Sequence, residues 1–97
     1  MIITINFIFD TDFEFLNMPD ISQIIIIGKR ILDFEFRMKM AGISESKIIK
    51  IDSPAQLKDH LLLETGSYVE IIYGIYQAEN YKKIYNEVIK KLTGDLP

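Results

Sequence analysis

Apolar and polar positions form their clearest pattern in the middle of the chain. Residues 24–27 are four consecutive isoleucines, which is typical of a strand buried on both faces, and Gly28 after them marks a turn into a helix. This helix, over residues 29–41, ends at Gly42, because glycine adopts the left-handed conformation at low cost. Residues 48–51 are a second apolar run. A strand, a crossover helix and another strand predict a parallel α/β unit.

Within that helix, residues 34–40 also alternate between apolar and charged side chains, the pattern of a half-buried strand. We nevertheless predict a helix, because its residues are good helix formers and two parallel strands need a crossover. At about 100° per residue, the apolar side chains then form two stripes. The stripe that packs on the sheet comprises Ile31, Phe34, Met38 and Ala41, and the opposite stripe comprises Leu32, Phe36 and Met40. This opposite stripe lies either beneath residues 13–18 or against a partner protein.

The remaining segments complete the predicted sheet. Residues 2–9 and 68–73 are rich in β-branched and aromatic side chains and predict two further strands. The sequence SPAQ at 53–56 is a strong helix start, and Gly66 is expected to close that helix. Apolar residues at 3–4 spacing predict an amphipathic helix from residue 78 to the Thr-Gly pair at 93–94. We therefore predict one α/β domain over residues 1–97, with a mainly parallel four-stranded sheet and flanking helices.

Composition excludes several function classes. The 97 residues suffice for one hydrophobic core, and a net charge of −3 with scattered basic residues disfavours nucleic-acid binding. Without cysteine the chain offers no disulfide, thiolate metal site or cysteine nucleophile. No apolar run approaches the roughly 20 residues of a membrane span, and the N-terminus lacks a basic leader. We expect a soluble, cytoplasmic protein without a membrane span.

A basic turn is the first candidate site, because ligands of parallel sheets gather at the carboxyl ends of the strands. Gly28, Lys29 and Arg30 form either an anion cradle at a helix N-terminus or a plain turn with solvated cations. A P-loop would need another glycine upstream, where isoleucines stand instead. We therefore expect no nucleoside triphosphate site and no cofactor.

Acidic residues after the first strand are the second candidate. Asp10 and Asp12, near Glu14, are either a carboxylate pair for acid–base chemistry or magnesium binding, or an acidic surface loop. The segment that follows, as far as Pro19, is expected to form a short, shallowly buried helical turn. His60 is the only histidine, so no serine, histidine and acid set assembles in this chain.

Three segments resemble, in order and spacing, the C-terminal domain of MurT, the Mur-ligase-like subunit of the lipid II isoglutaminyl synthase. They are FIFDTDFEFL at 7–16, IIIIGKRILDFEFRMKMAGI at 24–43 and YGIYQAENYKKIYNEVI at 73–89. The resemblance implies a small Rossmann-like Mur ligase C-terminal domain that contacts GatD, a glutamine amidotransferase with a catalytic cysteine and histidine. It also implies that Asp10 or Asp12 matches an acid lent to that Cys-His site. The sequence departs from the family where Phe7 and Phe9 replace the usual tryptophans.

Two hypotheses about function follow. The first is a non-catalytic accessory domain, inactive alone, that docks through Leu32, Phe36 and Met40 onto a glutamine amidotransferase or Mur-ligase-like core in cell-wall precursor amidation. The alternative is a stand-alone small-molecule-binding or regulatory module with its site at the strand ends. A self-contained enzyme is disfavoured because no nucleophile–base pair is present. The sequence leaves open the oligomeric state and whether the chain is a fragment, a split subunit or a stand-alone relative.

Overall fold

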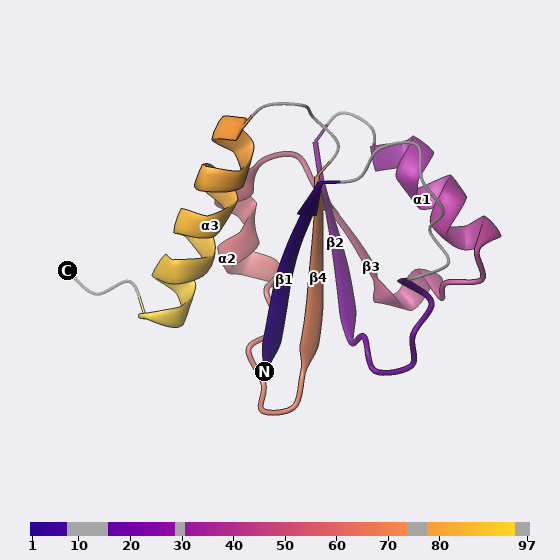
Figure 1. The fold of residues 1–97 in the computed structure, drawn as a ribbon, viewed down its shortest axis with the longest axis horizontal. Coiled ribbons are helices and arrows are strands. Elements are labelled where there is room, and N and C mark those ends of the chain that lie inside the picture. The colour runs from indigo at the N-terminus through magenta and orange to yellow at the C-terminus, as the bar shows by residue number, and fades with distance from the viewer. Residues whose placement is uncertain (8–15, 29–30, 74–77, 95–97) are drawn as a thin grey trace.

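Four parallel strands form the central sheet of the computed structural model, which describes residues 1–7, 16–28, 31–73 and 78–94. The strands are β1 (Ile2–Phe7), β2 (Gln23–Ile27), β3 (Ile48–Ile51) and β4 (Tyr68–Tyr73). Their order across the sheet is β1-β4-β2-β3, and every neighbouring pair is parallel (Figure 1). The predicted parallel four-stranded α/β sheet is therefore confirmed, with the first strand at an edge and the last in the interior.

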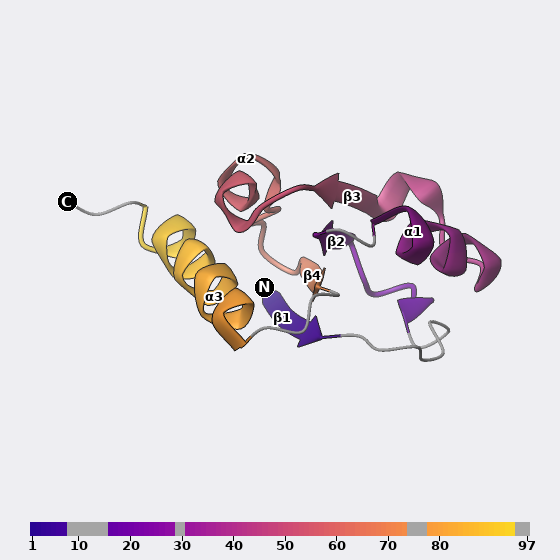
Figure 2. The same ribbon diagram turned by 90° about the horizontal axis from the view of Figure 1, so that it is seen from above.

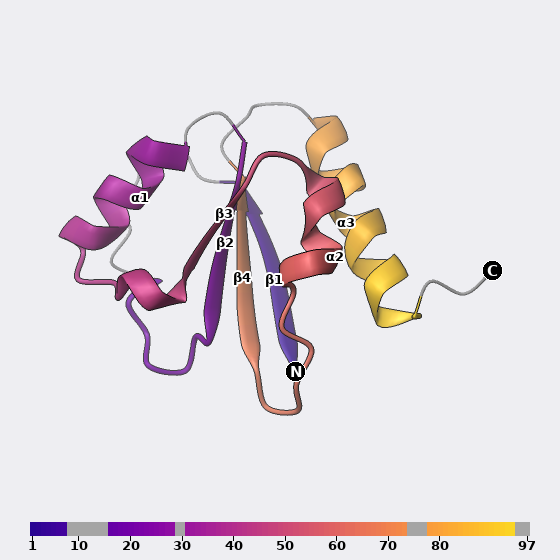
Figure 3. The same cartoon turned by 180° about the vertical axis from the view of Figure 1, so that it is seen from behind.

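Helices cover both faces of this sheet. Figure 2 shows α1 (Ile31–Met40) on one face and α2 (Leu57–His60) with α3 (Ala78–Leu92) on the other. From behind, α2 lies alongside α3 (Figure 3). Two short 3-10 helices, η2 (Glu45–Lys47) and η3 (Pro54–Gln56), precede β3 and α2. The described elements thus form three layers, helix, sheet and helices.

Alternation along the strands divides the buried apolar side chains into two clusters. In β2, Ile24 and Ile26 belong to the cluster under α1, whereas Ile25 and Ile27 belong to the cluster under α2 and α3. All five residues of β2 are buried, as expected of a strand covered on both faces. The isoleucine run is thus apolar throughout because each successive side chain enters a different core.

The segment that alternates between apolar and charged residues is a helix, α1. Phe34 and Met38 are buried under it, whereas the Leu32, Phe36 and Met40 side chains are exposed. After α1 the chain turns at Gly42, whose φ of +91° is left-handed. The predicted helix and its two apolar stripes are confirmed, because a crossover between the parallel strands β2 and β3 outweighs the period-two pattern.

The second helix is shorter than the sequence predicts. The capping box is present, since the Ser53 side chain and the Gln56 side chain each bond the other's backbone N–H. The α-helix nevertheless ends at His60, and Leu61 is already extended. Gln23 of β2 holds this end, because its Nε2 donates to the His60 carbonyl at 2.6 Å and its Oε1 accepts from the Leu62 N–H at 3.1 Å. The predicted continuation to Gly66 was wrong.

The connection between β1 and β2 packs more deeply than predicted. Leu16 and Ile21 are each only 1% exposed and belong to the cluster under α1. Asn17 donates a hydrogen bond to the Ala41 carbonyl at 3.2 Å, which ties this segment to the end of α1. The expectation of shallow burial was wrong for Leu16, because the part of the sheet face beside α1 needs apolar cover.

Candidate functional site

The carboxyl ends of the four strands lie at one edge of the sheet, shown at the top of Figure 1. β2 leads toward α1 on one face and β4 leads toward α3 on the other, so a topological switch point lies between these two strands. Their last residues, Ile27 and Tyr73, stand opposite each other in the register. Ligands of open α/β sheets bind at such switch points, so the carboxyl ends of β2 and β4 are the candidate ligand site.

Gly28 lies directly at this switch point. Its φ is +113°, a conformation that side-chain-bearing residues rarely adopt, and its N–H donates to the Ile51 carbonyl at 3.4 Å. The neighbouring Tyr73 has a raised pKa, first because it is partly buried and second because of the electrostatic effect of Tyr81. Gly28 therefore lies at the carboxyl end of β2, and its role in binding a ligand stays a prediction.

The other residues of the two strand-end candidates, Asp10, Asp12, Lys29 and Arg30, lie outside the described residues. Among the residues that are described, no group of three or more histidine, aspartate or glutamate side chains is placed to hold a metal ion. The roles of these four residues remain predictions from the sequence.

The end of β3 contributes backbone groups that already have partners. The N–H groups of Asp52 and Ser53 both donate to Gln56 Oε1, at 2.6 Å and 3.1 Å. Gln56 belongs to the capping box that begins η3. These donors serve the helix start, and the Gly28 N–H likewise has a partner, the Ile51 carbonyl.

A buried carboxylate lies deeper in the sheet, at a position that the sequence analysis did not single out. Glu70, in the middle of β4, is 4% exposed. Its two oxygens accept from Asn6 Nδ2 and from the Tyr68 hydroxyl, each at 2.7 Å. The hydrogen bond to Glu70 is the main reason why the pKa of Tyr68 is raised. The sequence did contain a signal for this site. Glu70 stands inside an otherwise apolar strand, and the first strand contains an asparagine that can donate to it.

An ion pair fixes α1 on the sheet. Lys50 of β3 reaches Glu35 of α1 with Nζ 2.9 Å from Oε2, and Lys39 approaches the same oxygen at 3.9 Å. The hydrogen bond from Lys50 is the main cause that lowers the pKa of Glu35. Within α1, Asp33 and Arg37 form an i,i+4 pair at 3.2 Å. This partly exposed ion pair links α1 to β3, while the buried Phe34 and Met38 side chains hold the helix on the sheet.

The orientation of α1 turns an apolar stripe outward. Leu32 is 75% exposed, Phe36 63% and Met40 74%, and all three lie on the side of α1 that faces away from the cluster beneath it. Large apolar side chains that are grouped in this way are characteristic of interaction surfaces. We call these three residues the α1 stripe.

A family model described as MurT ligase C-terminal matches residues 3–78 of the 97-residue chain. The chain belongs to the MurT ligase C-terminal family. The match covers nearly all of β1, the other three strands, α1 and α2, and it ends at the first residue of α3. The resemblance inferred from the sequence is thereby confirmed. No curated protein and no solved structure gives a significant match.

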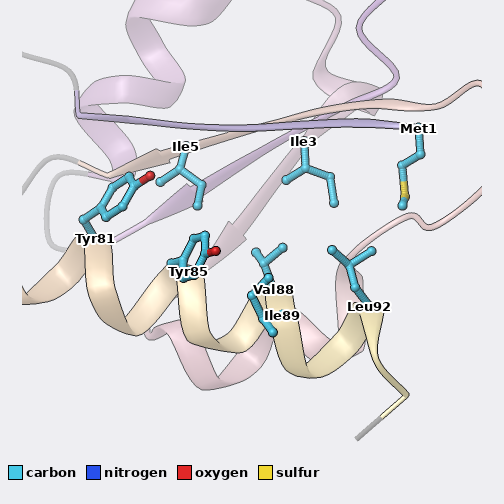
Figure 4. Close-up of a pocket in the computed structure, with 8 residues that line it drawn as sticks. All are labelled: Met1, Ile3, Ile5, Tyr81, Tyr85, Val88, Ile89 and Leu92. Atoms are coloured by element: carbon cyan, nitrogen blue, oxygen red, sulfur yellow. The ribbon is translucent and has the colours of Figure 1, made fainter.

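In this member of the MurT ligase C-terminal family, an apolar groove runs between β1 and α3. It has a volume of about 330 Å³ and is open to the surface (Figure 4). Met1, Ile3 and Ile5 line it from the strand, and α3 contributes Tyr81, Tyr85, Val88, Ile89 and Leu92. None of the helices in the described residues is long and apolar enough to cross a membrane.

Proposed function

We propose that this chain is a cytoplasmic α/β domain, without catalytic activity of its own, that docks onto a glutamine amidotransferase or a ligase core during amidation of cell-wall precursors. Membership of the MurT ligase C-terminal family supports the ligase context. The resemblance to MurT supports the amidotransferase, because that family works with GatD. The α1 stripe is the observation that carries the docking step.

The exposure of the α1 stripe is what makes it a docking surface. Three large apolar side chains, Leu32, Phe36 and Met40, follow one another at four-residue spacing, so they occupy one line along the helix. A partner that covers them removes apolar surface from water, which contributes about 25 cal/mol for each Å². Because Phe34 and Met38 are buried against the sheet, α1 presents this line of side chains at the surface.

Co-purification with a GatD-like amidotransferase tests this proposal. We expect Phe36→Ser to weaken binding at least about tenfold, because aromatic anchors contribute most strongly at interfaces. Tyr85→Ser on α3 is the matched control, since it removes another exposed aromatic side chain from a helix on the opposite face. Absence of binding by the unchanged chain, or equal loss with both variants, would refute docking through the α1 stripe.

The same resemblance supports a catalytic contribution in the complex. We propose that Asp10 or Asp12 supplies the carboxylate that orients the histidine of the partner's Cys-His site. Replacing the functional one with asparagine should lower glutaminase kcat at least about a hundredfold while leaving complex formation unchanged. Full activity of both Asp10→Asn and Asp12→Asn complexes would exclude the role.

A second candidate function rests on Gly28. Its left-handed backbone at the β2–β4 switch point favours a small anionic ligand at the strand ends, with Lys29 and Arg30 following in the sequence. Thermal-shift screening with nucleotides and acidic metabolites tests this candidate, since a ligand that binds the native state raises Tm. A shift that disappears in a Lys29→Gln, Arg30→Gln double variant would favour it over the docking domain.

A further inference from the structure

β1 presents an open edge to one side of the sheet. Within the described residues it pairs with β4 alone. The Ile2 N–H donates to the Ser67 carbonyl at 2.8 Å, so alternation along the strand turns the backbone groups of Ile3 and Ile5 away from β4. β1 contains no proline, glycine or charged residue, which are features that often protect edge strands from pairing. This edge can accept another strand.

An apolar stripe on α3 borders the same edge. Tyr81, Tyr85, Ile89 and Leu92 are between 39% and 49% exposed, although Ile84 and Val88 beside them are buried. The two tyrosine rings stack with a centroid separation of 6.3 Å. Figure 4 shows this stripe facing the side chains of β1 across the groove. The apolar face of α3 is therefore wider than the part of it that β1 covers.

We propose that a second copy of this chain covers the β1 edge and the α3 stripe. The two β1 strands pair antiparallel about a two-fold axis near Thr4, so that Ile3 of each copy stands opposite Ile5 of the other. The sheet then continues through eight strands, and the two α3 helices pack against each other on the same face. This interface lies away from α1, so the proposal goes beyond the docking function and does not depend on it.

Area favours a second copy as the occupant, and the lysines of α3 do not oppose it. If Tyr85 stands opposite Ile89, the two Lys82 residues are ten helical positions apart, or about 15 Å, which exceeds the screening length of about 8 Å at physiological salt. Met1, Ile2 and the four residues of the α3 stripe are about half exposed, and at about 80–100 Å² each they supply about 500 Å². Together with the backbone edge of β1, the area buried on each partner approaches the value of a stable interface, which is about 800 Å² per partner.

Sedimentation velocity over a concentration series tests the self-association. We expect a species of twice the 11.3 kDa mass of one chain. Tyr85→Glu should raise the dimer dissociation constant by about a hundredfold, because it buries an unpaired carboxylate between the α3 helices. Asn86→Glu adds the same charge at the next exposed position of α3 and should leave the constant within about threefold of the unchanged chain. Circular dichroism verifies that both variants keep their helices.

Hydrogen exchange at Ile3 and Ile5 tests the strand pairing separately. Their amides should be protected at concentrations where the dimer forms and should exchange rapidly on dilution, whereas the Ile2 amide stays protected at both. A monomer at millimolar concentration, a dimer that Tyr85→Glu leaves intact, or a dimer with unprotected Ile3 and Ile5 amides would each overturn the proposal. Failure of amidotransferase docking would not, because that test uses α1.

Discussion

Replacing Gln23 with methionine removes the side chain that holds the end of α2 to β2. Gln23 is 9% exposed and makes two hydrogen bonds, to the His60 carbonyl and from the Leu62 N–H. Methionine has similar length and volume but makes neither bond. At about 1 kcal/mol net for each bond, the free energy of unfolding should fall by about 2 kcal/mol. For a domain of this size, Tm should fall by about 8–16 °C.

Urea denaturation measures this loss, and Gln56→Met is the matched control. Gln56 also makes two hydrogen bonds through its side chain, but at an exposed helix start, so the same replacement should cost only about 1 kcal/mol. Hydrogen exchange should show that Gln23→Met also deprotects the Leu62 amide. A change below about 0.5 kcal/mol for Gln23→Met, or equal losses for both variants, would refute the assignment of Gln23 as the anchor of α2.

Three further predictions concern α1 and the buried carboxylate. Phe34→Ala should lower the free energy of unfolding by about 3–5 kcal/mol and Phe36→Ala by less than about 0.5 kcal/mol, measured by urea denaturation; equal losses would contradict the helical arrangement. The pKa of Glu35 is lowered from 4.5 in the folded protein. The stability that Glu35 contributes should therefore be present above pH 4.5 and be lost as the pH falls through the lowered pKa. Glu35→Gln should abolish this part of the dependence of stability on pH. Ultraviolet titration should find that the pKa of Tyr68 is above 10 and that Glu70→Gln returns it toward 10, because the hydrogen bond to Glu70 is the main cause of the shift; an unchanged titration curve would contradict this cause.

Local sequence patterns were sufficient to predict the sheet and α1. The isoleucine run of β2 and the apolar residues of β3 require burial between layers, and parallel neighbours require a crossover. That topological requirement separates helix from strand where the alternation at residues 34–40 does not. The outward position of Phe36 then follows from helical geometry alone.

Contacts between distant residues explain what the sequence did not predict. α2 ends at His60 because Gln23, on another strand, replaces the helical hydrogen bonds that would have continued it. Glu70 tolerates burial because Asn6 and Tyr68 donate to it, and only the β1–β4 register brings Asn6 within reach. At the strand ends, the roles of Gly28 and of the neighbouring acids and cations all remain predictions from the sequence.

Four identical side chains in β2 have a consequence for how the sheet finds its alignment. Shifting this strand by one position would exchange the contents of the two cores, yet isoleucine would still meet isoleucine at most sites. Shape and hydrophobicity therefore distinguish the correct alignment from its neighbour only weakly. The residues on either side of the run make the distinction. Gln23 has fixed hydrogen-bond partners, and Gly28 has a backbone conformation that few other residues can adopt. In this strand the two end residues specify the register, and the buried isoleucines between them supply the hydrophobic stabilisation.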